Sequence, residues 1–115
     1  MFKFERLDVW RFSLEMYRKI AASTRQLQRR DQSFLTDQIK RAALSISSNI
    51  AEGTGREGTR ESKQFFNIAK GSTYEVISIA FVLRQEGLVE EEAFSAIYDQ
   101  CDRIARMLSA LIDKR

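Results

Sequence analysis

Apolar residues recur along this chain at alternating spacings of three and four, in four stretches joined by short polar links. This spacing is typical of one face of an α-helix, and it predicts helices over about residues 5–28, 34–53, 59–86 and 91–113. The predicted core positions, helix by helix, are Leu7, Trp10, Leu14, Tyr17, Ala21 and Thr24; Leu35, Ile39, Ala42, Ala43, Ile46 and Ile50; Phe65, Ile68, Ala69, Ser72, Val76, Ile79 and Leu83; and Phe94, Ile97, Cys101, Ile104, Leu108 and Leu111.

The residues between these stretches fit helix ends. Gly53 is expected to end the second helix in the left-handed conformation, and Gly87 is expected to end the third. Asp31 and Ser33 are suited to cap the second helix, and Thr54 or Thr59 is suited to start the third. Because links of a few residues make consecutive helices antiparallel neighbours, the chain is predicted to be all-α, a single up-down-up-down four-helix bundle over residues 1–115.

The first and third helices carry a second apolar stripe beside the first. A helix that is apolar nearly all round is buried nearly all round, and a four-helix bundle has no central helix. We therefore expect the second stripes to contact other copies of this chain in a homo-oligomer. The predicted interface residues are Val9, Met16, Ile20, Leu27, Phe66, Tyr74, Ile77 and Phe81.

The second helix also carries a polar ridge beside its core stripe, continued at comparable positions on the third helix. Buried polar groups need hydrogen-bond partners, so one interpretation is a structural network that fixes the register of the bundle. The other is a pocket for a ligand or nucleic acid. The ridge residues are Gln38, Arg41, Ser45, Asn49, Glu52, Ser72 and Glu75.

Basic residues are concentrated in the first half of the chain. Residues 1–60 hold 12 Lys and Arg against 7 Asp and Glu, whereas the remainder holds 7 against 9, and the formal net charge is +3. Arginine forks suit phosphate geometry, which favours nucleic acid as a partner. Glu15 lies within one turn of several of these residues, so a solvated face with ion pairs is the alternative. The candidate nucleic-acid-binding residues are Arg11, Arg18, Arg25, Arg29, Arg41, Arg56, Arg60 and Lys63.

Catalytic chemistry has little support in this composition. The chain has no histidine and one cysteine, Cys101, which the pattern places on a core stripe. We therefore expect no enzymatic activity, no metal site and no cofactor. We also expect no membrane-spanning segment and a cytoplasmic location, because apolar runs are short and the first residues are charged.

One segment carries a family resemblance. The run Gln-Ile-Lys-Arg-Ala-Ala-Leu-Ser-Ile-Ser-Ser-Asn-Ile-Ala-Glu-Gly-Thr-Gly-Arg over residues 38–56 resembles the signature of the bacterial four helix bundle proteins, also called 23S rRNA-intervening sequence proteins. Leu-Asp-Val-Trp at 7–10 and Phe-Phe-Asn-Ile-Ala-Lys-Gly-Ser-Thr-Tyr-Glu at 65–75 agree with it in the same order. The family is similar to the accessory variability determinant proteins of diversity-generating retroelements.

This resemblance implies a four-helix protomer that assembles as a ring, commonly a pentamer. It also implies RNA or DNA as a partner of a basic oligomer, and a reverse transcriptase as a candidate protein partner. The alternative is a structural or protein-partner scaffold with no nucleic-acid role.

Overall fold

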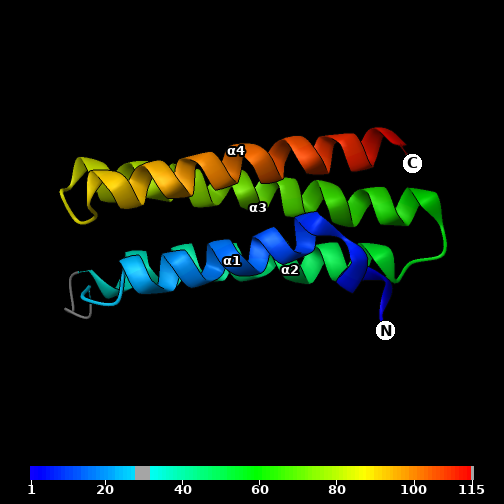
Figure 1. Ribbon diagram of the computed structural model, residues 1–115, viewed down its shortest axis with the longest axis horizontal. Coiled ribbons are helices and arrows are strands. Elements are labelled where there is room, and N and C mark those ends of the chain that lie inside the picture. The colour runs from blue at the N-terminus through cyan, green and yellow to red at the C-terminus, as the bar shows by residue number, and fades with distance from the viewer. Residues whose placement is uncertain (28–31, 115) are drawn as a thin grey trace.

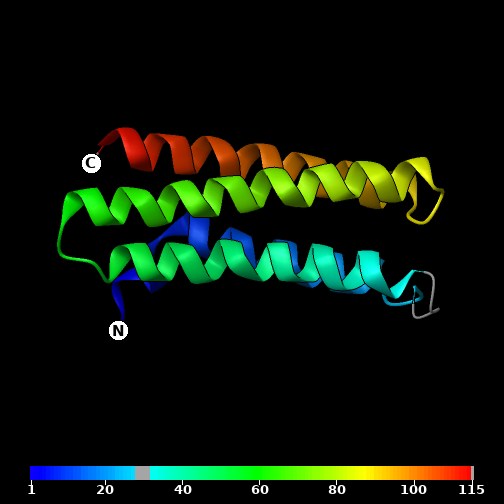
Figure 2. The same cartoon turned by 180° about the vertical axis from the view of Figure 1, so that it is seen from behind.

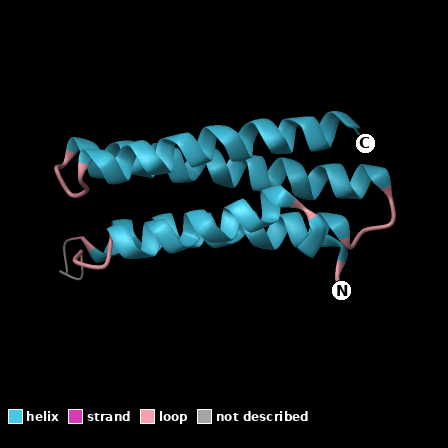
Figure 3. Cartoon of the chain, viewed as in Figure 1, coloured by secondary structure: helices cyan, strands magenta, loops and turns pink. Residues whose placement is uncertain are grey.

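Four long helices run antiparallel along one axis in the computed structural model, which describes residues 1–27 and 32–114 (Figure 1). A short 3₁₀ helix precedes them, and the elements in chain order are η1 (Lys3–Arg6), α1 (Asp8–Ser23), α2 (Ser33–Thr54), α3 (Thr59–Gln85) and α4 (Glu91–Lys114). The bundle measures 44 × 22 × 22 Å. Within the described ranges, only links and chain ends lie outside helices (Figure 3).

The helices form two layers, α1 with α2 and α3 with α4. Both opposite views place α3 and α4 on one side of the bundle and α1 and α2 on the other (Figure 2). The α2–α3 pair packs most extensively and the α1–α4 pair least among neighbours. This arrangement confirms the predicted all-α, up-down-up-down four-helix bundle.

The bundle core contains the second apolar stripe of α1 rather than the stripe that was predicted to be buried. Met16 and Ile20 of α1 are completely buried, whereas Leu14, a predicted core residue, is 43% exposed. Ile68 of α3, also a predicted core residue, is 51% exposed. Two neighbouring stripes have the same helical period, so only the positions of α2 and α4 around α1 decide which of them is covered.

This burial corrects the predicted oligomer interface. Five of its residues lie in the protomer's own core, where no second chain can contact them: Val9, Met16, Ile20, Leu27 and Phe66. The prediction is wrong for these five. The other three stand nearer the surface, since Tyr74 is 60% exposed, Phe81 is 44% exposed and Ile77 is half-buried. Their role in self-association stays a prediction.

The two glycines with predicted roles differ in conformation. Gly87 has a φ of +70° and follows α3, as expected. The Leu88 amide donates to the Leu83 carbonyl (2.8 Å) and the Gly87 amide to the Arg84 carbonyl (3.0 Å), which together form a Schellman ending.

Gly53 does not end α2, and among the described glycines only Gly87 has a positive φ. Gly53 is buried one residue before the end of the helix, where the completely buried ring of Phe66 lies against its backbone. A Cβ at Gly53 would come within 2.5 Å of Phe66 Cε1. The position therefore needs glycine for close packing rather than for a left-handed turn.

The remaining helix ends refine the predicted boundaries. Of the two alternatives for the start of the third helix, Thr59 is the first residue of α3, while Thr54 closes α2. Ser33, predicted as a cap, is instead the first residue of α2, and Gln32 occupies the cap position. Asp31 lies outside the described residues. The first helix is shorter than predicted at both ends, because η1 occupies its expected start and Thr24 follows its last turn.

Candidate nucleic-acid interface

The outer side of α1 carries two arginines seven residues apart, and a third arginine follows in the turn after the helix. Arg11, Arg18 and Arg25 are all exposed. Because seven residues are close to two helical turns, Arg11 and Arg18 share one face of α1, whereas Arg25 lies in the turn beyond the end of the helix. Arg11 is ion-paired with Asp8 and donates a hydrogen bond to the Glu5 carbonyl (2.8 Å). A shallow depression on this side is lined by Arg11, Leu14, Glu15, Arg18 and Lys19.

Helix α2 adds two basic residues next to α1. Lys40 and Arg41 line a common depression with Tyr17 of α1, Asp37 and Leu44. Arg41 is exposed and Lys40 half-buried. These two residues extend the basic surface across the groove between the helices. We call the combined surface of Arg11, Arg18, Arg25, Lys40 and Arg41 the α1–α2 basic face.

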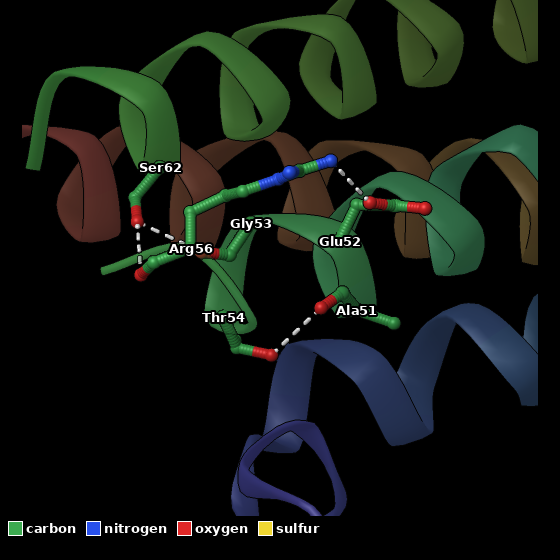
Figure 4. Close-up of polar contacts among 6 residues, drawn as sticks. All are labelled: Ala51, Glu52, Gly53, Thr54, Arg56 and Ser62. Carbon is green, nitrogen blue, oxygen red and sulfur yellow. Dashed lines mark hydrogen bonds and ion pairs between the residues drawn. The ribbon is translucent and has the colours of Figure 1, made fainter. Parts of the chain in front are cut away.

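The basic residues near the α2–α3 link form a separate group. Arg56 donates to Glu52 (2.9 Å) and lies over the Phe65 ring, 4.7 Å from its centroid. Figure 4 shows this ion pair beside Ser62, whose hydroxyl donates to the Gly53 carbonyl (2.8 Å). Arg60 is exposed and Lys63 half-buried on the first turns of α3.

The eight predicted nucleic-acid-binding residues are thus divided by the fold. Arg11, Arg18, Arg25 and Arg41 belong to the α1–α2 basic face. Arg56 lies against α3 and forms an ion pair with Glu52. Arg60 and Lys63, the other two residues near the α2–α3 link, belong to α3. Arg29 lies outside the described residues.

The predicted polar ridge is partly joined by hydrogen bonds. The Ser45 and Ser72 hydroxyls meet between α2 and α3 (2.8 Å), and the Asn49 amide donates to the Ser45 carbonyl (2.8 Å) and hydroxyl (3.0 Å). Glu52 pairs with Arg56, as described above. The remaining ridge residues are at the surface, with Gln38 half-buried and Arg41 and Glu75 exposed. The joined part links two helices, which is the geometry that a register-fixing network requires.

An exposed aromatic surface lies on the opposite layer and includes a residue that sequence reasoning missed. Tyr98 of α4 is 47% exposed and packs near Phe81 of α3, with ring centroids 6.2 Å apart. Phe81 also contacts the buried ring of Phe94 edge-on at 5.0 Å. The available signal was the spacing, since Tyr98 follows Phe94 by one helical turn at the edge of the core stripe. We call Tyr74, Ile77, Phe81 and Tyr98 the α3–α4 aromatic surface.

The single cysteine is buried in the bundle. Its thiol lies 3.5 Å from the Met16 sulfur, and burial raises the pKa of Cys101 to about 12. The thiol is therefore protonated at neutral pH and a poor nucleophile. Among residues 1–27 and 32–114, no group of three metal-binding side chains comes together. None of the helices described is both long and apolar enough to cross a membrane.

Comparison with known proteins identifies the family. The family model for 23S rRNA-intervening sequence proteins matches residues 5–110. This chain belongs to that family. The match covers α1, α2 and α3 in full and α4 as far as residue 110, and it includes both the α1–α2 basic face and the α3–α4 aromatic surface.

A solved structure from Bacteroides thetaiotaomicron, of a protein with unknown function from the S23 ribosomal protein family, has the same fold. It aligns with a TM-score of 0.83 and 24% sequence identity, over 90% of this chain and 97% of that chain. No match was found among curated proteins.

Proposed function

We propose that this 23S rRNA-intervening sequence protein is a non-enzymatic nucleic-acid-binding protein that contacts phosphates through its α1–α2 basic face. The observation that carries the proposal is the exposed pair Arg11 and Arg18 on the outer side of α1, with Arg25 exposed in the turn that follows and Lys40 and Arg41 on α2. The family's name associates its members with intervening sequences of 23S rRNA, which makes RNA the first probe.

The spacing of the arginines suits a nucleic-acid backbone. Positions seven residues apart on an α-helix are separated by roughly 10.5 Å along its axis. Three base-pair steps of a B-form DNA duplex cover roughly the same length, since each strand carries a phosphate about every 3.4 Å of axis. The axial spacing of Arg11 and Arg18 on α1 therefore matches that of phosphates three steps apart on one strand.

The chemistry of the face favours binding without strong base preference. Phosphate contacts position a protein on a nucleic acid but carry no sequence information. The α1–α2 basic face presents arginine and lysine, with Glu15 and Asp37 among them, whereas base-specific readout needs side chains that reach base edges in a groove. Affinity should accordingly depend on salt more than on sequence.

Fluorescence anisotropy with labelled single-stranded and duplex RNA and DNA at low salt tests the proposal. Replacing Arg18 and Arg25 together by Gln should weaken binding and lower the slope of log K against log salt by about 1.5–2. The matched control changes Arg106 and Lys114 of α4 to Gln, with the same loss of charge, and should bind like the wild type. Equal losses in both variants, or no binding of any probe at tens of micromolar protein, would refute phosphate recognition by this face.

A second candidate function, self-association as a scaffold, is favoured by the α3–α4 aromatic surface. Tyr74, Phe81 and Tyr98 expose between 44% and 60% of their area. Clustered exposed aromatic side chains are typical of protein interfaces. A ring of five copies, as the family resemblance implies, would return five times the protomer mass of 13.4 kDa.

Light scattering measures this association directly. Replacing Phe81 by Glu should dissociate the assembly while circular dichroism keeps its helical signal, because a charge would be buried between copies. The matched control replaces Val82 by Glu, since Val82 is 42% exposed and is the next residue of α3. If wild-type protein scatters as the protomer at micromolar concentration, the scaffold proposal fails.

A further inference from the structure

A small pocket opens between α3 and α4, on the side of the bundle away from the basic face. Its volume is about 140 Å³, and its walls are Thr73, Tyr74, Ile77, Tyr98, Cys101, Asp102 and Ala105. A cavity of roughly 150 Å³ accommodates benzene. The pocket thus has room for one ring or one branched group of similar size.

Two tyrosines and a carboxylate give this pocket its chemistry. Tyr74 and Tyr98 belong to facing helices, and each leaves about half of its area exposed. Aromatic faces attract cations that lie within roughly 6 Å of the ring centroid, and quaternary ammonium groups are recognised by such rings. Asp102 supplies the one formal charge of the lining.

The other walls add no competing charge. Ile77 and Ala105 are apolar, and the Thr73 hydroxyl already donates to the Ala69 carbonyl (2.9 Å). The Cys101 thiol is neutral at physiological pH because burial raises its pKa to about 12. A carboxylate at the edge of an otherwise neutral, partly aromatic pocket attracts a cation with an apolar surface more strongly than it attracts a hydrated metal ion.

The geometry points to a binding site for an alkylated ammonium group between Tyr74 and Tyr98, with Asp102 as the counter-charge. The rings contact the methyl groups of the cation, and the carboxylate balances its charge at the mouth of the pocket. Arg106 already pairs with Asp102 across one turn of α4. This exposed pair is weak, so a bound cation competes with it, and Arg106 limits the affinity of the site.

Choline is the probe, and 3,3-dimethyl-1-butanol, its neutral isostere, is the control for shape. Each is titrated into labelled protein at constant ionic strength while backbone amide shifts are recorded by NMR. We expect saturable shifts from choline at Tyr98, Asp102 and Ala105, with an affinity at least about tenfold above that of the neutral alcohol.

Four variants resolve the contributions of the lining. Tyr98→Phe keeps the ring and should retain affinity within about twofold, whereas Tyr98→Leu should lose about tenfold. Asp102→Asn should weaken choline binding about fivefold, and Arg106→Gln should strengthen it about threefold by releasing the carboxylate.

The site is independent of nucleic-acid binding, but it lies within the α3–α4 aromatic surface. A second copy seated there would compete with choline, so in an associated protein choline should shift light scattering towards the protomer. Equal binding of choline and the alcohol would overturn the inference in favour of a plain apolar pocket. Amide shifts spread over acidic residues throughout the helices would show only general electrostatic screening by choline, and would also overturn the inference. If choline causes neither amide shifts nor a change in light scattering, the proposed site does not exist.

Discussion

The contact between Gly53 and Phe66 permits a prediction whose size follows from the structure. Replacing Gly53 by Ala adds a Cβ that would lie 2.5 Å from Cε1 and 2.8 Å from Cδ1 of Phe66. The ring is completely buried and cannot move aside into solvent. Forcing an extra carbon into such a site costs about 1–3 kcal/mol.

A second effect of the same change has the opposite sign. Alanine is favoured over glycine inside a helix by about 1 kcal/mol. Gly71 in α3 isolates this term, because nothing lies within 4 Å of a Cβ built there. Gly71→Ala should therefore stabilise the protein by up to about 1 kcal/mol, while Gly53→Ala should be neutral to destabilising by about 2 kcal/mol.

Urea unfolding followed by circular dichroism measures both variants. The difference between them, about 1–3 kcal/mol, reports the clash alone, since propensity is common to both. Phe66→Leu in the Gly53→Ala background should remove most of that difference, which a double-mutant cycle would reveal as coupling. If Gly53→Ala is as stable as Gly71→Ala, close packing against Phe66 is not the reason that residue 53 is glycine.

Three further predictions concern single residues. Asn49→Ala should lower the free energy of unfolding by about 1 kcal/mol by removing the amide bonds to Ser45; an unchanged urea midpoint would contradict the network. Gly87→Ala should cost about 1–2 kcal/mol in the same assay, because its φ is +70°, and a stabilised variant would argue against that conformation. Burial raises the pKa of Cys101 from 9.0 to about 12, so the unfolded state loses this proton first and stability falls as pH rises above about 9. Between about pH 9 and 10.5 the wild type should lose about 1–2 kcal/mol more than Cys101→Ala; parallel pH profiles would exclude this linkage.

Local signals in the chain determined the number of helices and several of their ends. Helical periodicity depends only on nearby residues, so the four stretches could be predicted without knowledge of their neighbours. The same holds for Gly87, since an αL ending is a property of the backbone at one position. The start of α3 at Thr59 agrees for similar reasons.

The polar ridge could be predicted in part. Ser45, Asn49 and Ser72 were grouped correctly because spacings of three and four put ridge residues on one face of each helix. Their partners could not be assigned, since the Ser45–Ser72 bond depends on how far α3 slides along α2. The Asn49 amide bonds to Ser45 within its own helix.

Tertiary packing alone decided which apolar stripe of α1 is covered. The stripes through Leu14 and Met16 have the same period, and both satisfy the pattern of an amphipathic helix. Burial depends on the directions from which α2 and α4 approach, which local sequence does not encode. The same reason applies to Gly53, whose requirement comes from the Phe66 ring of another helix. The period of an amphipathic helix depends on its own residues, but the side of the helix that is buried depends on the helices packed against it.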